Sequence, residues 1–235
     1  MRTANIVVGI LLLACDAGAE FRPLFRSKKE LLATPIKHLK VREGTDIFWE
    51  LCRTIERPCG HEGIRVNDPA TAAPQGGLDL KNTNAEQVLE LIVKKAPGYR
   101  WEIRNGVINL EPNRPQFESQ LSRPLEPIKF KNMSAGRAAF NAISHAGIKA
   151  AWQAPGRERI KLFTLPFKGG SVRDVLNSIA LWDGQIMWYF TTDAAGHSLF
   201  MLPNWGPSPR TSKEDVDVER QRFKEDYERW TKRAL

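Results

Sequence analysis

The chain has 235 residues, which is enough for one large domain or two small ones, each able to bury a core of its own. A formal charge of +8 at pH 7 permits nucleic acid, anionic lipid or an acidic protein as partner, and by itself selects none of them. Beyond the N-terminal leader no apolar run approaches the roughly 20 residues of a membrane-spanning helix, so the sequence predicts a mature chain without a transmembrane span.

The N-terminus has the pattern of a secretory signal peptide, predicted to cover residues 1–19. Met1 and Arg2 form a short positive region, residues 6–14 are apolar, and Ala17-Gly18-Ala19 offers a cleavage site of small residues. The preceding Leu-Leu-Ala-Cys resembles a bacterial lipobox, which would make Cys15 a lipidated N-terminus, and both routes stay open. Either route predicts export from the cytoplasm.

Two cysteines remain once the leader is removed. Cys52 and Cys59 flank a predicted helix end and turn, and in an oxidising compartment such a pair favours a disulfide. The alternative is a metal site that adds His61 and His38. Because this spacing matches no standard zinc pattern, the disulfide is preferred and no metal is predicted.

Residues 20–35 are a basic lead-in segment, and residues 36–112 predict a first α+β module. Asn105-Gly106 is typical of a two-residue hairpin turn, because both positions tolerate a positive φ. The hydrophobic patterns of this module predict helices from Thr45 to the stop at Pro58 and over residues 85–95, and strands at 38–42, 64–66, 78–81, 99–103 and 107–110.

Residues 113–126 are rich in proline and predict a stiff linker, after which residues 127–203 predict a second module of the same order. Its predicted helices cover residues 135–146 and 172–182, and its predicted strands 128–130, 148–152, 160–167, 186–190 and 198–202. Residues 204–235 predict a linker and a charged amphipathic helix. The apolar face of that helix either packs on the second module or docks a partner.

One strand–helix unit recurs four times and suggests a repeated module. Its predicted capping residues are Thr45, Asn84, Ser134 and Ser171, and a basic residue stands three places before each of them: Arg42, Lys81, Lys131 and Lys168. The helix pattern of Val88, Leu89 and Ile92 returns 87 residues later as Val175, Leu176 and Ile179. The sequence therefore predicts an α+β fold of two tandem β-α-β-β-α-β-β modules, each of two paired βαβ halves, followed by the C-terminal helix.

These units resemble the short N-terminal domain of secretins and TonB-dependent receptors. The shared pattern is a strand ending in Phe or Leu, then Lys, a turn and a cap, a helix with Val-Leu-x-x-Ile, an aromatic strand and a short hairpin. It is clearest over 80–110 and 167–202, and looser over 39–66 and 128–152. The resemblance implies a periplasmic domain that binds another envelope protein. Because no barrel, plug or pore region follows here, it implies a free-standing accessory or regulatory protein of a secretion or transport and signalling system. No cofactor is predicted.

Catalytic patterns are absent from the sequence. Its four histidines, His38, His61, His145 and His197, belong to no His-x-x-x-His arrangement, and no Gly-x-Ser-x-Gly is present, so no enzyme is predicted. The glycines before Ser171 are interpreted as a turn and cap in preference to an anion site. Residues 60–63, Gly-His-Glu-Gly, formally match the phosphate-clamping loop of KH domains and are interpreted as an ordinary loop. The alternative function is a basic anion- or nucleic-acid-binding protein of KH-like topology.

The strand at 186–190 is apolar on both faces, so it is either covered twice or lies at an interface. The C-terminal helix is the preferred second cover. The candidate partner-binding residues are Trp188, Phe190, Phe223, Tyr227 and Trp230. Sheet edges offer a second mode of contact, by strand addition.

Overall fold

The computed structural model describes residues 27–65, 76–113, 118–153, 162–193 and 198–203, together with positions 221 and 225. The signal peptide, Cys15, Phe223, Tyr227 and Trp230 lie outside these residues. Of the expected C-terminal helix, Gln221 and Glu225 are described, and both are helical. None of the described helices is long and apolar enough to cross a membrane.

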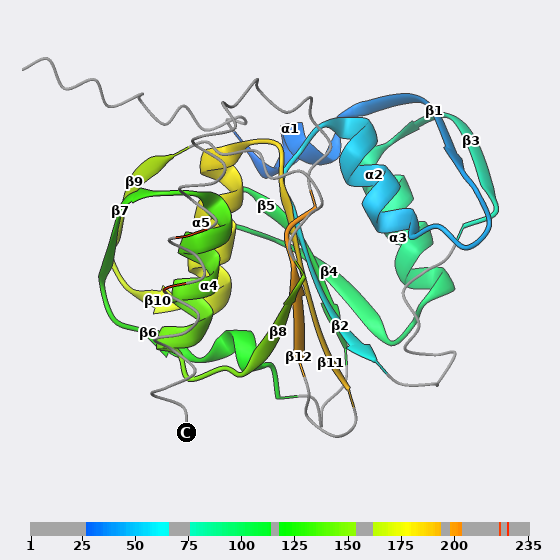
Figure 1. The fold of residues 1–235 in the computed structure, drawn as a ribbon. Coiled ribbons are helices and arrows are strands. Elements are labelled where there is room, and N and C mark those ends of the chain that lie inside the picture. Colours follow the sequence, from blue (N-terminus) through cyan, green and yellow to red (C-terminus); the bar gives the residue numbers. More distant parts are fainter. Residues whose placement is uncertain are drawn as a thin grey trace, which may run out of the picture.

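The predicted α+β class is confirmed (Figure 1). The first half of the chain forms α1 (Lys28–Leu32), β1 (Pro35–Val41), α2 (Ile47–Ile55), β2 (Cys59–Arg65), β3 (Leu78–Asn84), α3 (Ala85–Lys95), β4 (Tyr99–Arg104) and β5 (Val107–Pro112). The second half forms η2 (Gln120–Ser122), β6 (Pro124–Leu125), β7 (Ile128–Met133), α4 (Ala135–His145), β8 (Ala150–Gln153), β9 (Phe163–Phe167), β10 (Gly170–Ser171), α5 (Val172–Asp183), β11 (Met187–Asp193) and β12 (Ser198–Met201).

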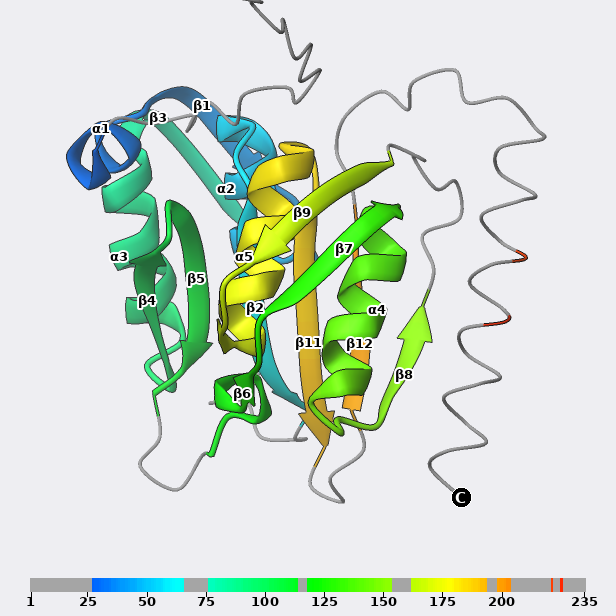
Figure 2. The ribbon, with the colours of Figure 1, turned by 90° about the vertical axis from the view of Figure 1, so that its left-hand side faces the viewer.

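A six-stranded sheet with the order β4-β5-β2-β11-β12-β8 runs through the middle of the molecule. Helices α2 and α3 cover one face of it and α4 and α5 the other, and the strand pairs β1·β3 and β7·β9 lie outside the helices (Figures 1 and 2). The two halves join where β2 and β11 pair in parallel, from Cys59 opposite Met187 to Arg65 opposite Asp193. The two halves therefore share one sheet. That they are separate modules with the predicted boundaries stays a prediction.

The two halves use the same strand order, β4-β5-β2 and β11-β12-β8. In each, the first pair is antiparallel and the second parallel. Since β11 is parallel to β2 but antiparallel to β12, strand β8 runs opposite to β2. The second half is therefore turned over relative to the first, which is why its helices cover the opposite face of the shared sheet.

Three of the four predicted helix caps are confirmed. The side chains of Asn84, Ser134 and Ser171 each accept a backbone N–H from the first turn of their helix. The fourth was wrong, because Asp46, not Thr45, caps α2 and accepts from two backbone N–H groups. A carboxylate is favoured there because it meets both the unpaired N–H groups and the positive end of the helix dipole.

With Asp46 as the cap, the basic residue three places earlier is lost from the first unit, where Glu43 occupies that place. A different feature is common to all four units: a left-handed residue two places before the cap. These residues are Gly44, Asn82, Asn132 and Gly169, with φ values of 75, 53, 47 and 99°. Glycine and asparagine are the residues that adopt this conformation most readily, so the turn chemistry, not the positive charge, defines the repeat.

Strand β2 differs from the prediction. Residues 64–66 were expected to form a short strand after a loop at 60–63, but the strand begins at Cys59 and lies in the middle of the sheet. His61 and Glu62 are fully buried within it. The expectation of a loop was wrong. The alternative of a nucleic-acid-binding protein of KH-like topology therefore loses residues 60–63 as its phosphate-clamping loop. The segment expected as a linker also contributes structure, because Leu121 and Leu125 in η2 and β6 are buried in the second core.

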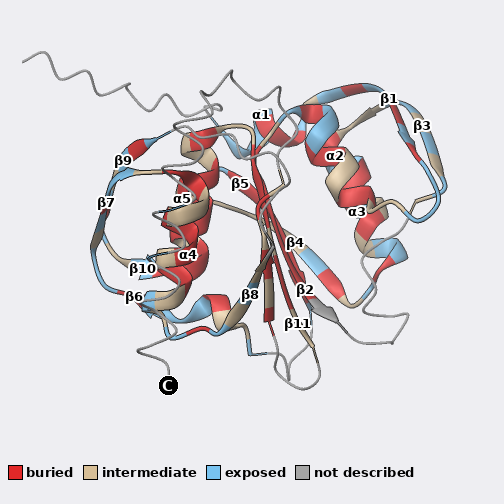
Figure 3. Ribbon diagram, viewed as in Figure 1, coloured by how far each residue is buried: buried red, intermediate tan, exposed pale blue. Residues whose placement is uncertain are grey.

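The sheet lies between two layers of helices whose inner sides are buried (Figure 3). It separates two hydrophobic cores, and β11 contributes to both. Trp188 and Phe190 face α4 and α5, whereas Met187 and Tyr189 face the core of α2 and α3. This strand is therefore covered twice, as its composition suggested, but its second cover is the first half of the chain. Trp188 and Phe190 are 0% exposed and pack in the second core, so their expected role as surface residues that bind a partner is corrected.

The predicted disulfide between Cys52 and Cys59 is confirmed and ties the last turn of α2 to the start of β2. Both cysteines are fully buried. We expect the double variant Cys52→Ala/Cys59→Ala to lose about 2–3 kcal/mol of unfolding free energy, because a closed loop of this size restricts the unfolded chain. Urea denaturation would measure the loss, and adding reductant to the native chain should reproduce most of it. An unchanged midpoint would contradict the prediction.

Candidate functional site

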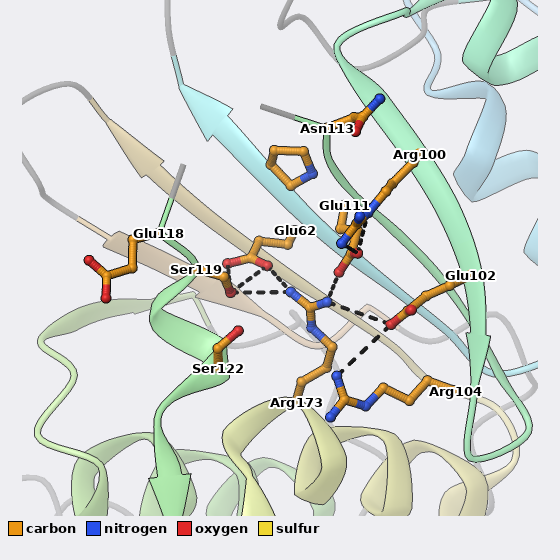
Figure 4. Close-up of a pocket in the computed structure, with 11 residues that line it drawn as sticks. Glu62, Arg100, Glu102, Arg104, Glu111, Asn113, Glu118, Ser119, Ser122 and Arg173 are labelled. Atoms are coloured by element: carbon orange, nitrogen blue, oxygen red, sulfur yellow. Dashed lines mark hydrogen bonds and ion pairs between the residues drawn. The ribbon is translucent and has the colours of Figure 1, made fainter. Parts of the chain in front are cut away.

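A polar cavity of about 490 Å³ lies where the sheet of the first half meets the start of α5 (Figure 4). Three arginines and four glutamates line it, together with smaller polar residues. The lining residues are Glu62, Arg100, Glu102, Arg104, Glu111, Pro112, Asn113, Glu118, Ser119, Ser122 and Arg173.

The alternation of side chains along β4 builds one wall of this cavity. Arg100, Glu102 and Arg104 face the cavity, while Trp101 and Ile103 between them pack on the first core. Glu111 on β5 and Glu62 on β2 extend the same face. The remaining charge, Arg173, is the second residue of α5 and projects onto the sheet between the carboxylates (Figure 4).

Arg173 lies at the centre of the cavity and is shared by several carboxylates. Its guanidinium forms ion pairs with Glu62 and Glu111, and all three side chains are 1–5% exposed. Its Nη2 also donates to the Ser119 hydroxyl at 3.1 Å, and that hydroxyl donates to the Glu62 carboxylate at 2.7 Å. Arg173 comes from the second half and the two glutamates from the first, so this cluster bridges the joint between them.

A second, more exposed layer of pairs surrounds this centre. Arg100 donates to Glu111 at 2.7 Å, and Arg104 donates to Asp174 at 2.7 and 3.1 Å. Glu102 forms the longest of these ion pairs, because its Oε1 lies 3.8 and 4.0 Å from guanidinium nitrogens of Arg173 and Arg104 and accepts no hydrogen bond among the described residues. This oxygen of Glu102 can therefore still accept a hydrogen bond.

Burial and pairing shift two carboxyl groups in opposite directions. Burial raises the pKa of Glu62 above its ordinary value, and its contacts with Arg173 and Ser119 offset only part of that effect. For Asp174, burial also acts to raise the pKa. The hydrogen bonds from the Ser171 backbone and hydroxyl and from Arg104 outweigh it, so the pKa of Asp174 is lowered.

These shifts predict opposite pH dependences for two matched variants. A raised folded-state pKa means that the stabilisation from protonated Glu62 is present at low pH and is lost as the pH rises through that pKa. We therefore expect the unfolding free energy of Glu62→Gln to improve relative to the native chain between about pH 4 and pH 7.

Asp174→Asn is the control of opposite sign. The lowered pKa of Asp174 gives the native chain an advantage that is present at neutral pH and is lost as the pH falls below about 4. Urea denaturation across this pH range would measure both variants. Equal pH slopes for the two would contradict the prediction.

The buried charges of this site pair residues of the first half with Arg173 of the second. Of the two serines that line the cavity, Ser119 is the one that bonds the buried charges, and its oxygen also accepts the backbone N–H of Leu121 at 3.1 Å. Its neighbour Glu62 is tied to Arg173. The described residues contain no group of three or more His, Cys, Asp or Glu placed to hold a metal. The metal alternative also loses Cys52 and Cys59 to the disulfide.

The three histidines that the structure describes lie apart from one another, and His197 lies outside the described residues. His38 pairs with Asp79 at 2.8 Å on the outer strand pair, and the exposed His145 bonds the Asn141 carbonyl oxygen at the end of α4. His61 is buried on the face of β2 opposite Glu62, where its ring lies 4.5 Å from that of Tyr189. The turn and cap expected at Ser171 is also present.

The charged cavity was missed in the sequence. In the sequence Glu62 was considered only as part of the Gly-His-Glu-Gly motif, and Arg173 is a single basic residue at the start of a predicted helix. Their partnership spans 111 residues and depends on the pairing of β2 with β11. The one local signal was Arg173 itself, a charge among the mostly apolar buried residues of α5.

Comparison of the chain with protein-family models, curated proteins and solved structures gave no match.

Proposed function

We propose that this chain is a periplasmic, non-enzymatic interaction module of the cell envelope. In this role it is an accessory or regulatory protein of a secretion or transport and signalling system, and it binds another envelope protein by strand addition to its central sheet. The single observation that carries the proposal is the open six-stranded sheet, whose edge strands β4 and β8 pair with no further strand among the described residues. Unpaired edge N–H and C=O groups accept an added strand.

The charge arrangement supports the same function. Almost every buried charge of the cavity is used in pairing the two halves, which gives a rigid joint and leaves the edges as the surfaces with unused bonding capacity. Among the described residues, one large hydrophobic side chain is exposed, that of Leu162. An apolar docking patch therefore has little support in this part of the chain.

A proline in β4 gives a sharp test. Arg104 and Val107 flank the two-residue turn and share its closing hydrogen bonds, so the N–H groups of Trp101 and Ile103 point outward. Ile103→Pro therefore removes an outward donor while leaving the pairing with β5. Ile103→Val keeps that donor and is the matched control. Thermal unfolding of both variants would verify that they remain folded.

The experiment is affinity capture from an envelope extract with the native chain, each Ile103 variant and a chain lacking residues 204–235. We expect one envelope protein to be retained by the native chain and by Ile103→Val. Recovery of no envelope protein by either the full or the shortened chain would overturn the function. Capture that Ile103→Pro leaves unchanged would overturn the use of β4.

A further inference from the structure

Two tryptophans show that β4 and β11 are the same strand of the repeated half. Trp101 on β4 donates its indole N–H to Glu90 of α3 at 3.1 Å. Trp188 on β11 donates its own to Asn177 of α5 at 2.8 Å. Both tryptophans and both acceptors are 87 residues apart, the spacing of the helix repeat. The two strands therefore hold equivalent places against equivalent helices.

Within the chain, the outer edge of β11 already carries a strand. That strand is β2, which runs parallel to β11 with Gly60 opposite Trp188. The indole of Trp188 lies across Gly60 so closely that a Cβ there would be 2.0 Å from its Cζ2 atom. A strand can therefore take this place only if it has glycine opposite the tryptophan.

The outer edge of β4 has the same geometry and no strand beside it among the described residues. Trp101 is only partly buried against the first core, whereas Trp188 is fully covered. The ammonium group of Lys28 lies 5.7 Å from the centre of the Trp101 ring, on an exposed side chain that can move aside. The β2·β11 joint thus indicates what an incoming strand must look like.

The next position adds a charge requirement. In the internal joint Tyr189 is opposite His61, and the two rings meet edge to face. The equivalent of Tyr189 on β4 is Glu102, which lines the cavity and whose Oε1 has no hydrogen-bond partner among the described residues. A neighbouring strand points its opposite side chain to the same face, so a cationic side chain there would enter the cavity and meet Glu102.

We propose that the outer edge of β4 binds an extended segment of a partner protein that runs parallel to β4, with glycine opposite Trp101 and Lys or Arg opposite Glu102. This inference rests on the proposed function and names the chemistry of the segment that one edge accepts. The glycine allows close approach to the indole, the backbone provides hydrogen bonds to Trp101 and Ile103, and the cation provides the charge match.

The chain's own β2 supplies the probe. It is a capped synthetic peptide of residues 58–65 that carries Cys59→Ser and His61→Lys. We expect it to shift the backbone amide resonances of residues 99–104 in a saturable way in the full-length protein. The same peptide with Gly60→Val should bind about tenfold or more weakly, because the added side chain overlaps the indole of Trp101. Equal binding of both peptides, or shifts confined to other residues, would overturn the inference.

The charge match has a separate test that does not perturb the fold. Glu102 is 40% exposed on its side chain, so Glu102→Gln should fold normally. In a double-mutant cycle, this variant and a Lys→Gln change in the peptide should each weaken binding a few-fold, with no further loss when combined. Additive losses would remove Glu102 from the site.

The two proposals fail in distinguishable ways. If envelope capture succeeds but no peptide shifts β4, the inference about β4 is wrong and the function stands. If the peptide binds β4 while neither the full nor the shortened chain captures an envelope protein, the edge is a strand acceptor and the envelope function is wrong.

Discussion

Arg173→Met should lower the free energy of unfolding by about 3–5 kcal/mol, because it removes the only cation that contacts two buried carboxylates at once among the described residues. Glu62 and Glu111 would be left facing each other with almost no exposure to water, and only Ser119 and Arg100 remain as their partners. Methionine keeps the apolar length of the arginine stem, so the loss reports on charge more than on packing. Urea denaturation at neutral pH would measure it.

Two further variants separate this cause from general damage. Arg104→Met removes a guanidinium that is 39% exposed in the neighbouring pair with Asp174, and should cost no more than about 1 kcal/mol. Adding Glu62→Gln and Glu111→Gln to Arg173→Met should recover most of the stability, because the stranded negative charges are then absent. If the triple variant is no more stable than Arg173→Met, burial of unpaired charge is not the cause.

The elements that the sequence predicted well are those whose signals are local. The caps at Asn84, Ser134 and Ser171, the turn at Asn105-Gly106 and the apolar stripes of the helices depend on residues within a few positions of one another. The disulfide was equally local. Thr45 was the wrong cap because the basic-residue spacing was taken as the repeat, whereas the feature that the four units share is the left-handed residue two places before the cap.

The central strand β2 and the charged cavity could not be predicted from local signals, because their residues are stabilised by contacts with distant parts of the chain. Gly60 and Gly63 disfavour a strand by propensity, and a His-Glu pair between them suggests a surface turn. In the structure these residues belong to β2. Gly60 leaves room there for the indole of Trp188, and Glu62 forms a buried ion pair with Arg173. Both requirements come from the other half of the chain.

Gly60→Val should be the most damaging apolar substitution in the strand, with an expected loss of about 3 kcal/mol or more. The new Cβ would overlap the indole of Trp188, which is 0% exposed and anchored to Asn177, so the ring has little freedom to move away. The overlap falls at the joint where β2 meets β11. Near-ultraviolet circular dichroism would report the displaced tryptophan, and urea denaturation the lost stability.

A glycine in the same strand provides the control. At Gly63 an added Cβ would lie 3.3 Å from the Thr191 methyl group, a contact that a shift of a few tenths of an ångström relieves, so Gly63→Ala should cost about 1 kcal/mol or less. Trp188→Leu, which removes the obstructing ring, should make Gly60→Ala nearly neutral in that background, because contacting residues are not additive. If Gly60→Ala costs as much with leucine at 188 as with tryptophan, glycine is required by the backbone of β2. The close approach of the Trp188 indole would then not explain why β2 has glycine at this position. It would also give no reason for glycine in the strand that β4 is proposed to bind.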